Sequence, residues 1–106
     1  MSAGTPMAAY TYEDAREATR RAAFLNTARS PDSGEEHRIG LAEVFRSCRD
    51  RALKAGLAKG LTAEQVDAEI AQMCEDDVVR LRQVTDEEFT AFANESGDVV
   101  TRFLLP

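Results

Sequence analysis

The sequence predicts an all-α fold: a small bundle of three main helices, followed by a short fourth helix and an apolar C-terminal tail. Four segments place apolar residues three and four positions apart, which is the spacing of one buried helix face. Three of these segments begin with the Ser/Thr-x-x-Glu/Gln pattern of a capping box, at Ser33–Glu36, Thr62–Gln65 and Thr85–Glu88. Because glycine or proline interrupts the pattern between segments, we expect separate helices rather than one long one.

The first helix is predicted over residues 12–28, with Thr11 as its N-cap and acidic residues in its first turn. Its expected buried face consists of Ala15, Ala18, Ala22 and Leu25. Because alanine buries little area, two arrangements stay open. The helix packs closely on the rest of the chain, or a second subunit or a partner completes it. We expect residues 1–10 to be flexible and residues 11–106 to form one helical domain.

The second helix is predicted over residues 35–55. Its apolar face consists of Leu41, Val44, Phe45, Cys48 and Ala52. Gly40 weakens the early turns, because glycine in a helix interior costs about 1 kcal/mol relative to alanine. Gly56 and Gly60 are expected to end this helix and form a short connection.

The third helix is predicted over residues 63–84 and has the clearest pattern. Its apolar face consists of Val66, Ile70, Met73, Leu81 and Val84. Asp77 falls in the centre of this face, where an unpaired carboxylate would be costly. We consider three explanations, in this order: the helix ends or kinks near residues 75–77, Asp77 pairs with an arginine of the first or second helix, or a partner fills a groove there.

The fourth helix is predicted over residues 86–94, and residues 95–98 (Glu-Ser-Gly-Asp) are expected to form a turn. Residues 99–106 fit a strand or a helical turn equally well. The tail at Phe103 and Leu104 either folds back onto the core or inserts into a groove on a partner. In the second case Phe89, Phe92 and Phe103 would form one aromatic patch.

Composition excludes several classes of protein. No apolar run approaches the ~20 residues that a transmembrane helix needs. The chain has 13 basic and 19 acidic side chains, which argues against a strongly basic nucleic-acid binder. Cys48 and Cys74 fit neither a redox nor a zinc spacing, so we expect both to be free thiols, and no disulfide scaffold.

The net charge of −6 is unevenly distributed, with +2 on residues 1–60 and −8 on residues 61–106. Acidic residues three or four positions away accompany many arginines of the first two helices, which indicates local ion pairs such as Glu13 with Arg16 and Glu17 with Arg20 or Arg21. Most acids of the second part lack such neighbours. They therefore predict an exposed negative surface that would attract a basic partner.

No motif for catalysis, a metal or a cofactor is present in the sequence. His37, the single histidine, has no metal-ligating residue three or four positions away, and no histidine lies near Cys48. There is no glycine-rich phosphate loop. We therefore expect neither an enzyme nor a cofactor-binding protein.

The stretch Lys59–Ile70 (KGLTAEQVDAEI) resembles a segment near the C-terminus of bacterial type II antitoxins of the Phd and VapB kinds. It covers about a tenth of the chain. Those antitoxins have an N-terminal DNA-binding part with β-strands, whereas this N-terminus has a helical pattern. The resemblance implies a small bacterial neutralising or regulatory protein.

Our leading hypothesis is a non-enzymatic, cytoplasmic protein-binding module that modulates or inhibits a larger partner with a basic surface, without binding nucleic acid or a membrane. One alternative is a small subunit or adaptor held by its aromatic patch and tail. Another is a dimeric nucleic-acid-binding regulator that uses the arginines of the first two helices. Whether the chain forms a homodimer is left open. The expected partner-binding residues are Asp67, Glu69, Glu75, Asp76, Asp77, Glu87, Phe89, Phe92, Phe103 and Leu104.

Overall fold

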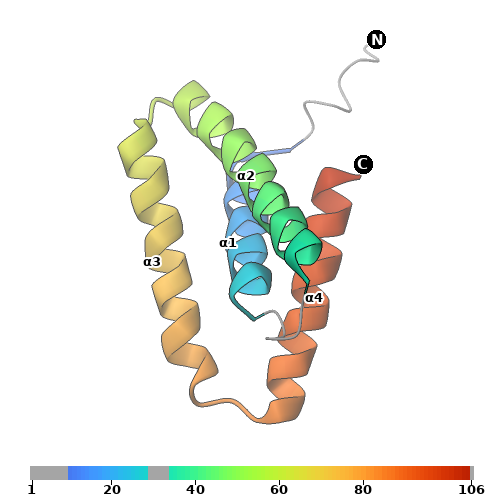
Figure 1. Cartoon of the computed structure of the whole chain (residues 1–106). Coiled ribbons are helices and arrows are strands. Elements are labelled where there is room, and N and C mark those ends of the chain that lie inside the picture. Colours follow the sequence, from blue (N-terminus) through green and yellow to red (C-terminus); the bar gives the residue numbers. More distant parts are fainter. Residues whose placement is uncertain (1–9, 29–33, 106) are drawn as a thin grey trace.

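The computed structural model describes residues 10–28 and 34–105, and within these ranges the only regular elements are α-helices. The helices are α1 (Tyr12–Ala28), α2 (Glu35–Ala58), α3 (Ala63–Leu81) and α4 (Asp86–Leu104). The predicted all-α class is therefore confirmed. All four helices are long, and they form a body of about 45 × 25 × 25 Å (Figure 1). Apart from Tyr10, the segment expected to be flexible lies outside the described residues.

Capping boxes start α3 and α4, as the sequence predicts. The Thr62 side chain accepts from the Gln65 backbone N–H and the Gln65 side chain accepts from Thr62, with the same reciprocal pair at Thr85 and Glu88. Thr11 and Asp14 exchange the equivalent bonds at the start of α1.

The third expected box, at Ser33–Glu36, lies partly outside the described residues. Gly34 is the N-cap of α2, and no side chain caps it. Ser33, which was expected to fill this role, lies outside the described residues. The predicted starts of α2, α3 and α4, at residues 35, 63 and 86, are therefore confirmed.

Gly60 alone ends α2, and Gly56 does not. Its φ of +95° is the left-handed conformation that a helix-ending glycine adopts. The Gly60 N–H donates to the Leu57 carbonyl at 3.0 Å, and the Leu61 N–H to the Gly56 carbonyl at 2.9 Å. These are the two bonds of a Schellman motif, so α2 continues to Ala58 rather than stopping at residue 55.

The expected short fourth helix is wrong. Residues 95–98, predicted as a turn, are helical, and residues 99–104 continue the same helix. Phe92, Ser96 and Val100 are buried at spacings of four, so the small serine extends the buried face across the expected turn. α3 also ends earlier than predicted, at Leu81.

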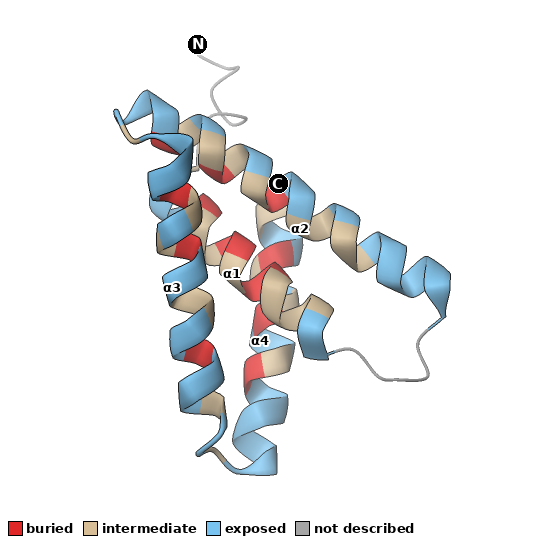
Figure 2. Cartoon of the chain, turned by 60° about the vertical axis from the view of Figure 1, so that its left-hand side comes forward, coloured by how far each residue is buried: buried red, intermediate tan, exposed pale blue. Residues whose placement is uncertain are grey.

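Helix α1 lies between the others and packs against α2, α4 and, less extensively, α3. Figures 1 and 2 show α3 and α4 on opposite sides of it. Ala15, Ala18 and Ala22 have almost no exposed surface. The alanine face therefore allows close packing within one chain, which is the first of the two arrangements that the sequence left open.

The core consists of two clusters along α1. The first contains Tyr12, Ala15, Ala52, Val66 and Ile70, and joins α1, α2 and α3. The second contains Ala18, Ala22, Cys48 and Val100, and joins α1, α2 and α4. Away from these clusters the first turns of α2 and the end of the α3–α4 hairpin are largely exposed (Figure 2).

Candidate partner-binding surface

Ion pairs between helices join cations of the first sixty residues to acids of the remainder. Such pairs are Arg16–Glu69, Arg20–Asp77, Arg21–Glu95 and Arg49–Asp67. The four acids come from α3 and α4, where the sequence predicted a free negative surface. Much of that charge therefore holds the bundle together.

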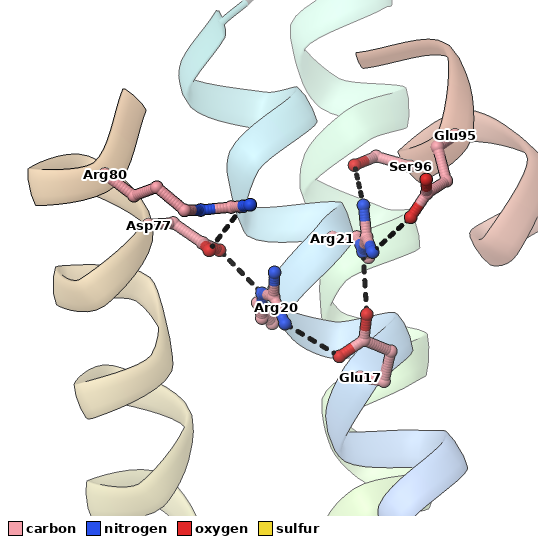
Figure 3. Close-up of polar contacts among 7 residues, drawn as sticks. All are labelled: Glu17, Arg20, Arg21, Asp77, Arg80, Glu95 and Ser96. Carbon is pink, nitrogen blue, oxygen red and sulfur yellow. Dashed lines mark hydrogen bonds and ion pairs between the residues drawn. The ribbon is translucent and has the colours of Figure 1, made fainter. Parts of the chain in front are cut away.

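Asp77 is buried and accepts a hydrogen bond from Arg20 Nε at 2.7 Å. Arg80, one turn further along α3, donates to the other carboxylate oxygen at 3.3 Å (Figure 3). The second of our three explanations is therefore confirmed. The first is wrong, because α3 continues past Asp77 to Leu81.

Arg21 makes the corresponding connection between α1 and α4. Its guanidinium donates to Glu17 at 2.8 Å, to Glu95 at 2.5 Å and to the Ser96 hydroxyl at 3.2 Å. The other Glu17 oxygen accepts from Arg20 at 2.9 Å, so this carboxylate links the two adjacent arginines (Figure 3). The predicted pairs of Glu17 are thus confirmed, and each arginine also reaches a second helix.

The Phe92 ring of α4 lies beneath this cluster of charges. The guanidinium carbons of Arg21 and Arg80 lie 4.5 and 4.8 Å from its centroid, within cation–π range. The Phe24 ring meets its edge at a centroid distance of 4.8 Å. Phe92, expected to contact a partner, is therefore part of the chain's own packing.

At the other end of the bundle, Glu69 accepts from the Tyr12 hydroxyl at 2.8 Å and from Arg16 at 2.6 Å. These bonds lower the pKa of Glu69. Glu13 pairs with Lys59 rather than with Arg16, which corrects the local pair predicted from spacing.

Asp67 and Arg49 form a two-bond pair, with distances of 2.9 and 2.8 Å, which lowers the pKa of Asp67. The pair fixes the first turns of α3 against α2. Asp67, Glu69 and Asp77, three of the expected partner-binding acids, are therefore engaged within the chain.

The Tyr12 phenol gives a testable pH dependence. Burial, and then the bond to Glu69, raise its pKa from 10.0 to about 12. The folded chain thus holds this proton more tightly than the unfolded chain. The stability it contributes is complete below pH 10 and is lost as the pH rises through about 12. Urea unfolding from pH 9 to 12 should show a steeper decline for the wild type than for Tyr12→Phe, and parallel declines would contradict this assignment.

The cross-helix pairs change the meaning of the charge asymmetry. When the charges of the four interhelical pairs are left out of the count, the net charge of the first sixty residues falls from +2 to −2. The net charge of the rest changes from −8 to −4. The opposite charges of the two parts are therefore largely complementary to each other. Only the unpaired acids are available to a partner.

Three unpaired acids lie near the end of the α3–α4 hairpin, and we call them the acidic tip: Asp76, Asp86 and Glu87. All are exposed, and in the described structure only Asp76 has a side-chain partner, the Gln72 amide at 3.0 Å. Glu75, on the outer side of α3, is also exposed and makes no ion pair with a described residue. The hairpin end extends past the C-terminal end of α1 in Figure 1.

The expected aromatic patch does not form as one surface. Phe89, which is partly exposed, and Phe92 both contact Phe24. Phe103 lies eleven residues beyond Phe92 along α4, about 16 Å away by helical rise. Its ring packs edge-on against that of Tyr10. Leu104, like Phe103, packs against the second core cluster. Phe103 and Leu104 therefore pack on the core of their own chain, but as the last turn of α4 rather than as a tail that folds back.

Both cysteines are free, as predicted, and they should react at very different rates. Cys48 is fully buried and burial raises its pKa to about 11, whereas Cys74 is half-buried with a pKa also raised by burial. Because the thiolate is the reactive form, we expect a thiol reagent to label Cys74 first and Cys48 only on unfolding. Mass spectrometry of each cysteine peptide over time measures this, and equal labelling rates would contradict the burial of Cys48.

Among residues 10–28 and 34–105, no three His, Cys, Asp or Glu side chains gather as a metal site would require. None of the described helices combines the length and apolar character needed to cross a membrane. No family model, curated protein or solved structure matches the chain. The resemblance of Lys59–Ile70 to antitoxins therefore remains a sequence interpretation.

Proposed function

We propose that this chain is a non-enzymatic protein-binding module whose acidic tip docks on a basic surface of a larger partner and modulates it. The observation that carries the proposal is the contrast between two groups of acids. Asp67, Glu69 and Asp77 are matched by arginines of the same chain, whereas Asp76, Asp86 and Glu87 are exposed and have no cationic partner among residues 10–28 and 34–105.

Electrostatics favours this use of the acidic tip. Exposed charges of one sign steer an oppositely charged protein toward the surface and set its orientation. Arg80, one turn beyond Asp76, is already held by Asp77, and Arg82 makes no ion pair with any described residue. The partly exposed Phe89, two residues beyond Glu87, adds an apolar contact at the edge of the tip.

The two alternative functions have less support. Phe103 and Leu104 contact the core of their own chain, which leaves little of the tail for an assembly. Arg16, Arg20, Arg21 and Arg49 are engaged in ion pairs, and a nucleic-acid site would need these groups for phosphates.

The test is a charge-reversed variant carrying Asp76→Lys, Asp86→Lys and Glu87→Lys, immobilised and exposed to a native lysate of the organism. The wild type should retain a basic protein that 0.5 M salt releases, and the variant should lose it. Retention that survives salt, or that the variant preserves, would overturn the proposal.

A matched control carries Glu36→Lys, Glu43→Lys and Asp50→Lys. These acids are exposed on α2 and make no ion pair with any described residue. Because both variants replace three acids by lysine, the change in net charge is the same. Glu36 lies in the first turn of α2, and Asp86 and Glu87 lie in the first turn of α4, so the control matches the dipole effect of one of these two reversals. The control should bind the partner as the wild type does, and circular dichroism should show both variants folded.

A further inference from the structure

The outer face of α3 carries exposed valines that nothing in the described chain covers. Val78 and Val79 are 50% and 56% exposed, and they line an open hollow of about 360 Å³ together with Cys74 and Glu75. At 100° per residue, Glu75 lies about 180° around the helix from the buried Val66. A surface helix usually carries polar residues there, and valine is also a weaker helix former than most.

Two opposite charges flank the valines on the same face. Glu75 and Arg82 are seven residues apart, so they lie within about 20° of each other around the axis and about 10 Å apart along it. Arg82 keeps helical angles, with φ −71° and ψ −16°. Both side chains are exposed, and neither makes a hydrogen bond or an ion pair within the described ranges.

This order of residues is complementary to itself when reversed. Consider two α3 helices that run antiparallel, related by a twofold axis between Val78 and Val79. The numbers of any two residues that face each other across the pair then add up to 157. Glu75 then faces the partner's Arg82, and Val78 faces the partner's Val79. Each contact occurs twice, as in any twofold interface. A parallel pairing would instead place Glu75 against Glu75 and Arg82 against Arg82.

We propose that two copies of this chain pair through the outer face of α3 in this antiparallel register. A second copy fits better than a basic protein, because one acid and one base balance across the valines and the face has no excess charge. Asp76 lies off this face and is bonded to Gln72.

The surroundings of α3 leave room for a second copy. In Figure 1 α3 forms one side of the molecule, with no other element outside it. The facing residues 75–82 cover about two helical turns on each copy, because α3 ends at Leu81. This contact is small for a stable interface, so we expect a dissociation constant of roughly 100 µM. The pairing is separate from the proposed function, because it leaves the acidic tip of each copy uncovered.

Sedimentation velocity of the full chain, from about 1 µM to 1 mM, tests the pairing. The wild type should pass from monomer to dimer in this range, and Val79→Lys should stay monomeric. Leu57→Lys replaces an equally exposed apolar residue, 56% exposed, on another surface and should dimerise like the wild type. A monomeric wild type at 1 mM, or a dimer that Val79→Lys preserves, would overturn the proposal.

A charge exchange tests the register. Glu75→Arg alone and Arg82→Glu alone each place like charges opposite one another and should weaken the dimer at least tenfold, whereas the double variant should restore it. Equal weakening by all three variants would overturn the antiparallel register. Val79→Lys should still retain the basic partner, and the reversed acidic tip should still dimerise, so each proposal can fail without the other.

Discussion

Gly56→Ala is expected to destabilise the protein, although alanine is normally the better residue inside a helix. The replacement should gain about 1 kcal/mol from helix propensity. Its Cβ, however, would overlap the Cγ2 methyl of Val66 and lie 3.2 Å from Cε1 of Tyr12. Gly56 is buried against side chains of α1 and α3, and these two residues, Tyr12 and Val66, belong to the core.

The expected net loss in the free energy of unfolding is about 1–3 kcal/mol, the usual cost of overpacking a core. Urea unfolding monitored by circular dichroism measures it. Gly40→Ala is the matched control on the same helix, because a Cβ there meets nothing within 4 Å. It should raise the stability by about 0.5–1 kcal/mol. A gain in both variants would contradict the close approach of the three helices at Gly56.

The same glycine shows where sequence reasoning about the fold reached its limit. The starts of α3 and α4 could be predicted, because Thr62 and Thr85 form bonds with residues only three positions away. Gly56 has the same local appearance as the helix-ending Gly60. Only the approach of α1 and α3 determines that Gly56 packs inside α2, and that approach is not encoded within a few residues.

The extension of α4 has a similar cause. Residues 95–98 have the composition of a turn, but Glu95 and Ser96 are both held by Arg21, which is 74 and 75 residues away in sequence. These tertiary bonds, together with burial of the small Ser96, outweigh the local preference for a turn. The alanines of α1 were predicted to be buried because alanine is apolar. Ser96 is equally small, but as a polar residue it was assigned to a turn.

The candidate site could be predicted only in part for the same reason. Asp76 and Glu87 are exposed, as expected, because an acid with no basic neighbour on its own helix is often free. Asp67 and Glu69 looked equally free, but their cations come from other helices. The sequence pattern of α3 was interpreted as one apolar face, so the exposed valines on its outer face were not predicted. Adjacent valines outside the buried face were the available signal.

Asp77→Ala is the other substitution with a large expected effect. It removes the partner of Arg20, whose side chain is only 18% exposed and which would keep Glu17 as its remaining acid. Breaking a buried pair by removing one partner typically costs 3–5 kcal/mol, and the remaining bond to Glu17 reduces this to about 2–3 kcal/mol. Asp76→Ala is the neighbouring control on the exposed side of α3 and should change the stability by less than about 0.5 kcal/mol.

Replacing both members of the pair separates the cost of a stranded charge from the value of the pair itself. Arg20→Met with Asp77→Leu leaves no buried charge unmatched and continues the apolar face of Val66 and Ile70, so it should recover most of the lost stability. A double variant as unstable as Asp77→Ala would show that the pair itself holds α3 on α1. If Asp77→Ala cost no more than Asp76→Ala, the bond between Arg20 and Asp77 would contribute nothing measurable to the fold. The expected recovery would instead mean that the Arg20–Asp77 pair adds little to the free energy of unfolding, because apolar contacts can supply the same stability. Its contribution would then be to fix the orientation of α3 on α1, which apolar contacts do not specify.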